Sequence, residues 1–328
     1  MKSESTSNDE SIESVCTTIR SLLKEAVKRN LTEGILLSGG LDTSILAALT
    51  SNYAHLKAFT VALDEAPAPD IEYATLMARH LRLEHIIHVI NTVEMHYALR
   101  EVIETMQSFD PVEVRNDLTV FIALKTAKEN DVSSVMTGDG ADELFAGYSF
   151  LYELKGEKLD QNLEKMWDVM RFSSLLLAEN LGIDVRLPYL DHDFKAYAMA
   201  LDSRLKVQTK DGKRWGKWIL RKTFENELPK EVTWRIKTPI EHGSGTTTLP
   251  SFFCQKTTDK EFEEKKQRYL EDDGVTIRDK EHLYYYEIYR STFGRPRPSD
   301  PEARICPQCN SNVPKKTSFC RTCGAYPI

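Results

Sequence analysis

Four short apolar segments in the first half of the chain alternate with segments of helical spacing. The apolar segments have the length and composition of buried strands and span residues 34–37, 57–63, 85–90 and 132–136. Alternation of strand and helix is typical of right-handed crossovers between parallel strands. We therefore predict an α/β fold, a doubly wound parallel sheet, with its core over residues 30–150 and a mostly helical second half over residues 151–293.

Charge and hydropathy narrow the class of protein. Hydrophobic residues make up 41% of the chain, and the formal net charge is -7. This negative charge argues against a protein whose main role is to bind nucleic acid. No run approaches the roughly 18 apolar residues that a membrane helix needs, so no membrane contact is expected. Residues 1–10 are polar and Ser-rich, which predicts a disordered tail and not a signal peptide. We expect a cytoplasmic enzyme.

The first predicted strand runs directly into the loop "SGGLDTS". Gly39 and Gly40 let the backbone turn tightly and point N–H groups at a ligand, and the start of the following helix adds its positive dipole end. Three hydroxyl groups in the loop can donate to phosphate oxygens: Ser38, Thr43 and Ser44. The loop lacks the Gly-Lys-Ser/Thr ending of the Walker-type P-loop, so it indicates a different nucleotide chemistry.

Asp42 is the unusual residue of this loop, because a carboxylate repels phosphate. An acid beside phosphates makes sense if a Mg²⁺ ion lies between them, so one interpretation makes Asp42 a metal ligand. The alternative makes Asp42 the N-cap of the following helix. The loop by itself does not decide between these two interpretations.

A second loop, "TGDGADELFAGY", follows the fourth predicted strand and carries the acids Asp139, Asp142 and Glu143. Several carboxylates at the end of a buried strand are costly unless cations or hydrogen bonds compensate them. Ligands of doubly wound sheets bind outside the carboxyl ends of the strands. Because both loops follow strands, we expect them to line the same edge of the sheet.

These two loops resemble those of a known family. "SGGLDTS" is similar to the SGGxDS signature of the N-type ATP pyrophosphatases (the PP-loop superfamily), with Thr43 in place of the usual Ser. "TGDGADELFAGY" resembles the synthetase domain of asparagine synthetases. Further landmarks follow in order: "DPVEVRND", "DVRLPYLDHD", "GKWILRKTFENELPKEV" and "WRIKTPIEHGSGT". The resemblance covers roughly residues 11–293 and implies an adenine nucleotide alpha hydrolase-like fold.

The resemblance implies a two-step ligase reaction. A carboxylate, with L-aspartate as the expected substrate, attacks the α-phosphorus of ATP to give an acyl-adenylate and pyrophosphate. Ammonia then displaces AMP and forms the amide, asparagine. Mg²⁺ held by Asp42 and Asp142 would stabilise the departing pyrophosphate.

The resemblance also assigns roles to residues of this sequence. Lys237 matches the catalytic lysine of the family, Asp139 the acid proposed to take a proton from the amine, and Arg115 an arginine near the phosphates. The ATP and pyrophosphate site is expected to comprise Leu37, Ser38, Gly39, Gly40, Asp42, Thr43, Ser44, Val61, Thr137, Gly138, Asp142, Gly243 and Ser244.

Two departures from the family pattern leave the substrates open. The glutamine-dependent enzymes carry an N-terminal glutaminase domain with a cysteine nucleophile, whereas this chain begins "MKSESTS" and has few residues before the first loop. We expect it to use free ammonia, ammonia from a partner glutaminase, or another amine. "IEHGSGTTT" resembles β-lactam-forming relatives that close a ring with an internal amine, although those place a tyrosine where Asp139 stands.

Two further alternatives lie outside amide synthesis. Relatives with the same ATP loop adenylate tRNA bases, and some carry zinc ribbons, but the net charge and the lack of a persulfide-type cysteine near the loop argue against nucleic acid as the partner. A non-enzymatic nucleotide-binding subunit would need broken catalytic positions, whereas Asp42, Asp142 and Lys237 are all present.

The C-terminal sequence is foreign to the core family. After a Pro-rich linker over residues 294–304, residues 305–328 contain two C-x-x-C pairs separated by ten residues: Cys306, Cys309, Cys320 and Cys323. This spacing predicts a zinc ribbon, with one structural Zn²⁺ held by four thiolates. Lys315, Lys316 and Arg321 give it a basic tip. The ribbon is either a stability clip or docking knob, the simpler interpretation, or a contact to RNA or an acidic carrier protein.

Overall fold

The computed structural model of the protein describes residues 11–300, 302–315 and 317–328. The tail predicted over residues 1–10 lies outside the described residues, as does Lys316.

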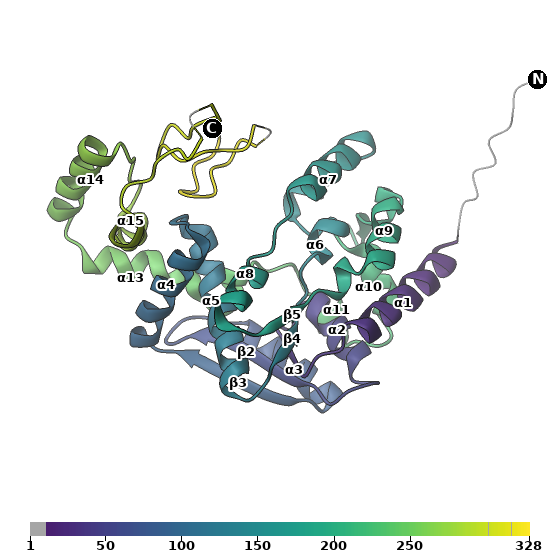
Figure 1. The fold of residues 1–328 in the computed structure, drawn as a ribbon. Coiled ribbons are helices and arrows are strands. Elements are labelled where there is room, and N and C mark those ends of the chain that lie inside the picture. The colour runs from purple at the N-terminus through teal and green to yellow at the C-terminus, as the bar shows by residue number, and fades with distance from the viewer. Residues whose placement is uncertain (1–10, 301, 316) are drawn as a thin grey trace, which may run out of the picture.

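A parallel sheet of five strands forms the centre of the molecule (Figure 1). The strands are β1 (Gly34–Leu36), β2 (Lys57–Leu63), β3 (Glu84–Ile90), β4 (Ser134–Met136) and β5 (Asp184–Arg186). Their order is β3-β2-β1-β4-β5, and every neighbouring pair is parallel. The doubly wound α/β fold is thus confirmed, and the four predicted strands agree with the structure to within two residues at each end.

The fifth strand was missed because its sequence has no apolar run. β5 has three residues, and Asp184 and Arg186 flank one buried valine, Val185. Such a strand is recognisable only from its partner, since it pairs with β4 at the edge of the sheet. The mostly helical second half also contains an antiparallel hairpin of β6 (Gln208–Lys210) and β7 (Lys213–Trp215).

Helices cover both faces of the sheet. Their bounds are α1 (Ile12–Arg29), α2 (Leu41–Thr50), α3 (Asp70–Leu81), α4 (Thr92–Met106), α5 (Pro111–Glu129), α6 (Ala141–Leu144), α7 (Glu157–Val169), α8 (Ser173–Leu181), α9 (His192–Ala200), α10 (Trp218–Phe224), α11 (Lys230–Thr233), α12 (Ile240–Ser244), α13 (Leu249–Lys256), α14 (Asp259–Asp273) and α15 (Lys280–Phe293). Short 3-10 turns lie at Ser149–Leu151, Pro188–Leu190, Ser203–Leu205 and Thr246–Thr248.

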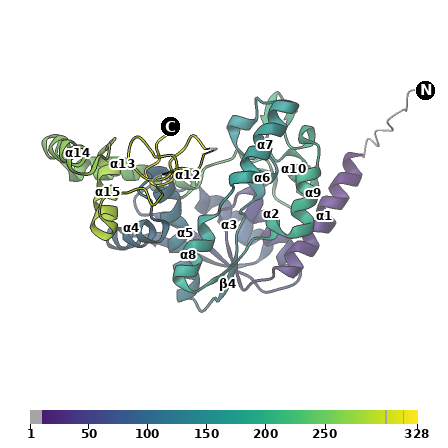
Figure 2. The same ribbon diagram turned by 45° about the horizontal axis from the view of Figure 1, so that its top comes forward.

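Two hydrophobic cores lie on opposite faces of the sheet, because successive side chains of a strand point to opposite sides. On β2, Phe59 and Val61 pack into the core formed with α4, α5, α8 and α15, whereas Ala58 packs into the core formed with α1, α2, α3, α9 and α10. Figure 2 shows α5 and α8 on one side of the sheet and α1 and α2 on the other.

The strand order reverses beside β1: β2 and β3 follow β1 toward one edge of the sheet, and β4 and β5 extend from β1 toward the other edge. β1 pairs with β2 on one side and with β4 on the other, so the connections leave toward opposite faces on either side of it. This is the point at which open α/β sheets bind ligands. The loops that follow β1 and β4 are "SGGLD" and "TGDGADE", so both begin at this switch point.

Residues 305–328 are here called the C-terminal module. Its described residues, 305–315 and 317–328, form no helix, and one isolated bridge joins Ile305 to Asn312. The four cysteines of the module are buried and belong to the same hydrophobic core as α4, α5 and α15. The module therefore lies against the body of the protein and shares its core.

Within the described residues, no helix combines the length and the apolar character that crossing a bilayer demands.

Candidate active site

The loop after β1 turns sharply into α2. Gly39 has a φ of 65°, and a Cβ there would lie 2.3 Å from the backbone N of Ala74 in α3, so the close approach to α3 requires glycine. α2 begins at Leu41, and Gly40 occupies its N-cap position. Asp42 is the second residue of the helix and is not its cap, which excludes the N-cap interpretation.

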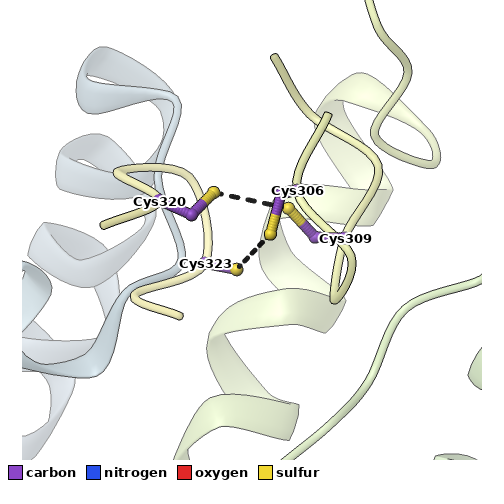
Figure 3. Close-up of side chains that lie close together, drawn as sticks. All are labelled: Cys306, Cys309, Cys320 and Cys323. Carbon is purple, nitrogen blue, oxygen red and sulfur yellow. Dashed lines mark hydrogen bonds between the residues drawn. The ribbon is translucent and has the colours of Figure 1, made fainter. Parts of the chain in front are cut away.

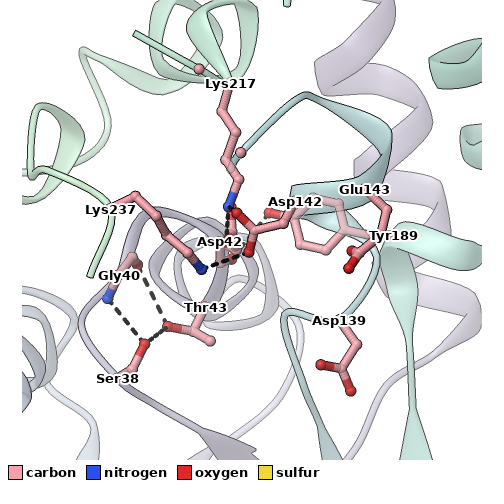
Figure 4. A network of polar contacts seen from close by, with 12 residues as sticks. Ser38, Gly40, Asp42, Thr43, Asp139, Asp142, Glu143, Tyr189, Lys217 and Lys237 are labelled. Carbon is pink, nitrogen blue, oxygen red and sulfur yellow. Dashed lines mark hydrogen bonds and ion pairs between the residues drawn. The ribbon is translucent and has the colours of Figure 1, made fainter. Parts of the chain in front are cut away.

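Asp42 faces the second loop across a buried lysine (Figure 4). Lys217 Nζ lies 2.5 Å from Asp42 Oδ2 and 2.6 Å from Asp142 Oδ1, and its side chain is 3% exposed. The two carboxylates are each 15% exposed. Asp42 Oδ1 is buried and accepts no hydrogen bond from any described residue. An orphaned carboxylate oxygen beside a second carboxylate is a donor set that suits Mg²⁺.

Lys237 completes this charge network. Its Nζ donates a hydrogen bond of 2.7 Å to Asp142 Oδ2. Burial alone would raise the pKa of Asp142, but Lys217 and Lys237 outweigh it and hold that pKa well below its usual range. Burial likewise opposes the charge on Lys237, but Asp142 and Asp42 raise its pKa above the usual value. Lys237 is therefore a cation at neutral pH, held in place by the acids.

A second ion pair fixes the opposite wall of the site. Arg235 Nη2 lies 2.5 Å from Asp70 Oδ1 at the start of α3, and Arg235 Nη1 donates to the carbonyl oxygen of Ser38 at 3.0 Å. Burial raises the pKa of Asp70 despite the neighbouring Arg235. Arg235 therefore links the loop after β1 to the segment that carries Lys237.

Asp139 lies half-buried near the start of the second loop, and two hydroxyl groups donate to one of its carboxylate oxygens. Thr137 Oγ1 donates to Asp139 Oδ2 at 2.8 Å and Ser174 Oγ donates to the same oxygen at 2.5 Å. Burial raises the pKa of Asp139, although both hydrogen bonds oppose the shift. The third acid of the loop, Glu143, instead accepts a hydrogen bond of 2.6 Å from Tyr148.

These groups surround one pocket outside the carboxyl ends of β1 and β4. One part of the pocket is lined by apolar side chains: Leu36, Leu37, Phe59, Val61, Val120, Ala123, Ile236 and Ile240. The other part is lined by polar and charged residues, among them Asp42, Asp142, Lys217, Lys237 and Asp139. The expectation that both loops line the same edge is borne out.

Most of the residues expected at the site lie in this pocket: Leu37, Ser38, Gly40, Asp42, Thr43, Val61, Thr137, Gly138, Asp139, Asp142 and Lys237. Others are not part of its lining. Gly39 turns toward α3, Ser44 is buried within α2, and Gly243 and Ser244 belong to α12, where Ser244 Oγ accepts a hydrogen bond of 3.0 Å from Thr119.

Arg115 also lies away from the lining of the pocket. Its Nε donates to Glu241 Oε2 at 2.7 Å and its Nη1 to Glu281 Oε2 at 2.6 Å. Arg115 therefore joins α5 to α12 and α15. Among the described residues, the structure records no contact between Arg115 and the loop after β1. Its expected place near the phosphates stays a prediction.

Sequence reasoning missed several residues of the pocket. Lys217 and Arg221 stand in "GKWILRK" and Arg235 in "WRIK", segments that we used as landmarks without assigning these residues a role. Asp70 and Ser174 carried no signal in the sequence. All five come from segments that are remote from the two loops in the sequence, so only the folded chain brings them to the same pocket.

A second group of ligand atoms lies in the C-terminal module (Figure 3). The sulfurs of Cys306, Cys309, Cys320 and Cys323 all lie within 4.8 Å of one another, and all four residues are buried. The distances are 3.8 Å between Cys306 and Cys323 and 3.7 Å between Cys309 and Cys320. Four sulfurs gathered around one point can hold a metal ion with tetrahedral coordination.

Similarity to known proteins agrees with this geometry. A family model described as asparagine synthase matches residues 18–181 and 168–297. Asparagine synthetase B (glutamine-hydrolyzing) of Escherichia coli strain K12 is 31% identical over 308 residues, which are 85% of this chain and 54% of that protein. The asparagine synthetase (glutamine-hydrolyzing) of Gallus gallus is 30% identical over 86% of this chain and 53% of that protein.

Among solved structures, the NMN synthetase of Francisella tularensis aligns with a TM-score of 0.39 and 14% identity, over 89% of this chain and 100% of that chain. The chain spans about half the length of the curated relatives it matches. The family model does not reach the C-terminal module but covers most of the residues before it. The chain belongs to the asparagine synthase family of ATP-dependent synthetases.

Proposed function

We propose that the protein is an amide-forming synthetase that adenylates the side-chain carboxylate of L-aspartate with ATP and transfers ammonia to give asparagine, AMP and pyrophosphate. The observation that carries this proposal is a pair of lysines beside the acids of the two loops: the buried Lys217 bridges Asp42 and Asp142, and the half-buried Lys237 pairs with Asp142. This arrangement concentrates positive charge where a pyrophosphate leaving group would form.

The pocket suits ATP at both ends. Its apolar part, with Val61 and Phe59 from β2, is suited to an adenine ring. Its polar part begins at Gly40, where the N-terminus of the ten-residue helix α2 directs its dipole at the site. Ser38 and Thr43, whose hydroxyl oxygens lie 3.3 Å apart, would donate to the phosphates.

The first step needs charge stabilisation more than acid–base chemistry. A carboxylate oxygen forms a bond to the α-phosphorus while the bond to the bridging oxygen of pyrophosphate breaks, and negative charge grows on the leaving group. Lys237 and Lys217 would turn from their carboxylate partners to these oxygens. Asp42 and Asp142 would hold Mg²⁺, which supplies further neutralisation of the phosphates when bound.

The second step needs a base for the attacking amine. The nitrogen of ammonia forms a bond to the acyl carbon, the bond from that carbon to the AMP oxygen breaks, and a proton leaves the nitrogen. Asp139 is suited to take this proton, because burial raises the pKa of its carboxyl group toward the range of an effective general base. Thr137 and Ser174 fix its orientation through Oδ2.

The source of the ammonia is a separate question. The curated relatives are named as glutamine-hydrolysing enzymes, and this chain covers about half of their length. We propose ammonia as the amine, taken from solution or delivered by a partner glutaminase.

The test is pyrophosphate release by the purified protein with Mg²⁺-ATP and ammonium, with and without L-aspartate, with asparagine detected by mass. The proposal predicts release that depends on aspartate, with one asparagine formed per pyrophosphate. Release that depends on tRNA would instead indicate a nucleic-acid-modifying enzyme. Release with a different carboxylate, or closure of a ring by an internal amine, would keep the adenylation and change the substrate.

A further inference from the structure

We propose that the C-terminal module is a metal-dependent brace, which holds two segments of the body in place and thereby positions the acceptor side of the active site. The family model ends before this module. The inference rests on the proposed function for the meaning of the acceptor side, but the contacts of the brace stand independently of it.

The first half of the brace is the pair Cys306 and Cys309 with the residues around it. The backbone N of Thr276 donates to the carbonyl oxygen of Gln308 at 2.8 Å, and Asn310 Nδ2 donates to the carbonyl oxygen of Gly274 at 3.1 Å. This pair of ligands is therefore bonded to the connection between α14 and α15.

The second half is the pair Cys320 and Cys323, which contacts a different segment. Ser108 Oγ donates to the carbonyl oxygen of Arg321 at 2.7 Å, and the backbone N of Phe109 donates to the carbonyl oxygen of Thr322 at 2.8 Å. These bonds attach this pair to the turn between α4 and α5. In Figure 3 the two pairs of cysteines lie next to different helices and face one another.

One ion bound by all four sulfurs would therefore tie the turn at residues 108–110 to the connection at residues 274–278. Arg278 strengthens the same junction, since its Nη2 donates to the carbonyl oxygen of Cys323 at 2.6 Å. Gly324 fits there only without a side chain, because a Cβ would lie 2.2 Å from Asp110 Oδ1. The module is thus closely fitted to the body.

Two routes lead from the module to the active site, and the first runs through the braced turn at residues 108–110. Asp110 is the N-cap of α5, its Oδ1 accepting a hydrogen bond of 3.2 Å from the backbone N of Val112, and α5 contributes Thr119, Val120 and Ala123 to the lining of the pocket. The start of α5 is therefore set by the turn that the module holds.

The second route runs through Arg321. Its Nη2 donates to the carbonyl oxygen of Val169 at the end of α7, at 2.8 Å. A short connection leads from there to Ser174 in the first turn of α8, which donates to Asp139. Arg321, part of the basic tip that the sequence predicts, is thus also a positioning residue for the acid of the amine step.

Hydrogen–deuterium exchange of the full-length protein tests the brace directly. We expect removal of the metal by a zinc chelator to raise exchange about tenfold in residues 108–118 and 168–176, and to leave exchange in residues 34–50 unchanged. Arg321→Ala should retain the metal and raise exchange in residues 168–176, with a several-fold higher KM for the acceptor. Lys315→Ala, an exposed lysine of the same module, is the matched control.

Exchange that rises only within residues 305–328 on chelation would overturn the proposal, and so would an Arg321→Ala protein that exchanges like the wild type. If chelation unfolds the whole chain, the exchange of the Arg321→Ala variant in residues 168–176 tests the proposal without chelation. If the protein releases no pyrophosphate with any carboxylate, the proposed function fails, while the exchange measurement still tests the brace.

Discussion

The pocket at the sheet edge and the C-terminal module both gather ligand atoms within a few ångströms, but they differ in what balances the charge. In the pocket, Asp42 and Asp142 are balanced by the side chains of Lys217 and Lys237. In the module, the four cysteine sulfurs face one another. The pocket can therefore fold before a ligand binds, whereas we propose that the module needs a bound ion in order to be stable.

This difference distinguishes a site whose ligands are exchanged during turnover from a site whose bound ion stabilises the fold. Under the proposed function, the lysines that neutralise the carboxylates would turn to phosphate oxygens when a nucleotide and Mg²⁺ bind, so the pocket would be loaded and emptied in each turnover. A closed site of four thiolates has no open position and releases its ion slowly, which suits a brace. The predictions below test this contrast, beginning with the largest expected effect.

The module should retain its metal when the pocket does not. Elemental analysis after dialysis against a chelator strong enough to strip Mg²⁺ should give about one zinc per chain and no magnesium, since structural zinc contributes roughly 10–16 kcal/mol. A metal-free protein with an unchanged melting temperature would contradict the assignment of a structural zinc site.

Lys217→Met should destabilise the fold, because it leaves Asp42 and Asp142 facing one another in a buried site. We expect the free energy of unfolding in urea to fall by about 3–5 kcal/mol, the range for breaking a buried ion pair. Added Mg²⁺ should restore part of the loss, since it takes the place of the missing charge. Lys158→Met, an exposed position on α7, serves as control, and equal stability of the two variants would remove Lys217 from this role.

Lys237→Ala should separate binding from chemistry. Turnover should fall at least ~100-fold, the effect of removing one charge-stabilising donor, while ATP affinity measured by calorimetry changes only a few-fold. Lys230→Ala, an exposed lysine at the start of α11, should behave like the wild type. Near-normal turnover of the Lys237 variant would take that residue out of the mechanism.

The pH dependence of the amine step should follow Asp139. Its carboxyl group must be deprotonated to accept a proton, so the rate should rise with pH, roughly tenfold per unit, up to the pKa of the folded enzyme. Because burial raises that pKa, the acid limb should lie above the range of an ordinary aspartate. Asp139→Asn should abolish this limb. If the limb persists in the variant, it belongs to another group.

The fold was predictable from local pattern, and the pocket only in part. The apolar strands, the glycine turn and the acids of both loops are contiguous in sequence, so their meeting at the switch point followed from the topology of parallel sheets. The residues that balance those acids are separated from them by long stretches of chain. Lys217 reaches Asp42 across 175 positions, and no local signal distinguishes it from a surface lysine.

The C-terminal module shows the same limit. The spacing of its cysteines indicated a metal site, but the hydrogen bonds that join Arg321 to Val169 and Ser108 to the second cysteine pair could not be read from the sequence. A basic residue in a short ribbon suggested an exposed tip. Arg321 is exposed in the folded chain, and its side chain also donates to the carbonyl oxygen of Val169 at the end of α7.

The most direct test of the account follows an oxygen atom. When a carboxylate is adenylated, one of its oxygens stays on the α-phosphorus after the amine displaces AMP. With L-aspartate labelled by ¹⁸O in its side-chain carboxylate, ammonium and Mg²⁺-ATP, the account predicts one ¹⁸O atom in each AMP and asparagine with one labelled oxygen fewer. Unlabelled AMP, with all the label still on the amino acid, would contradict the account.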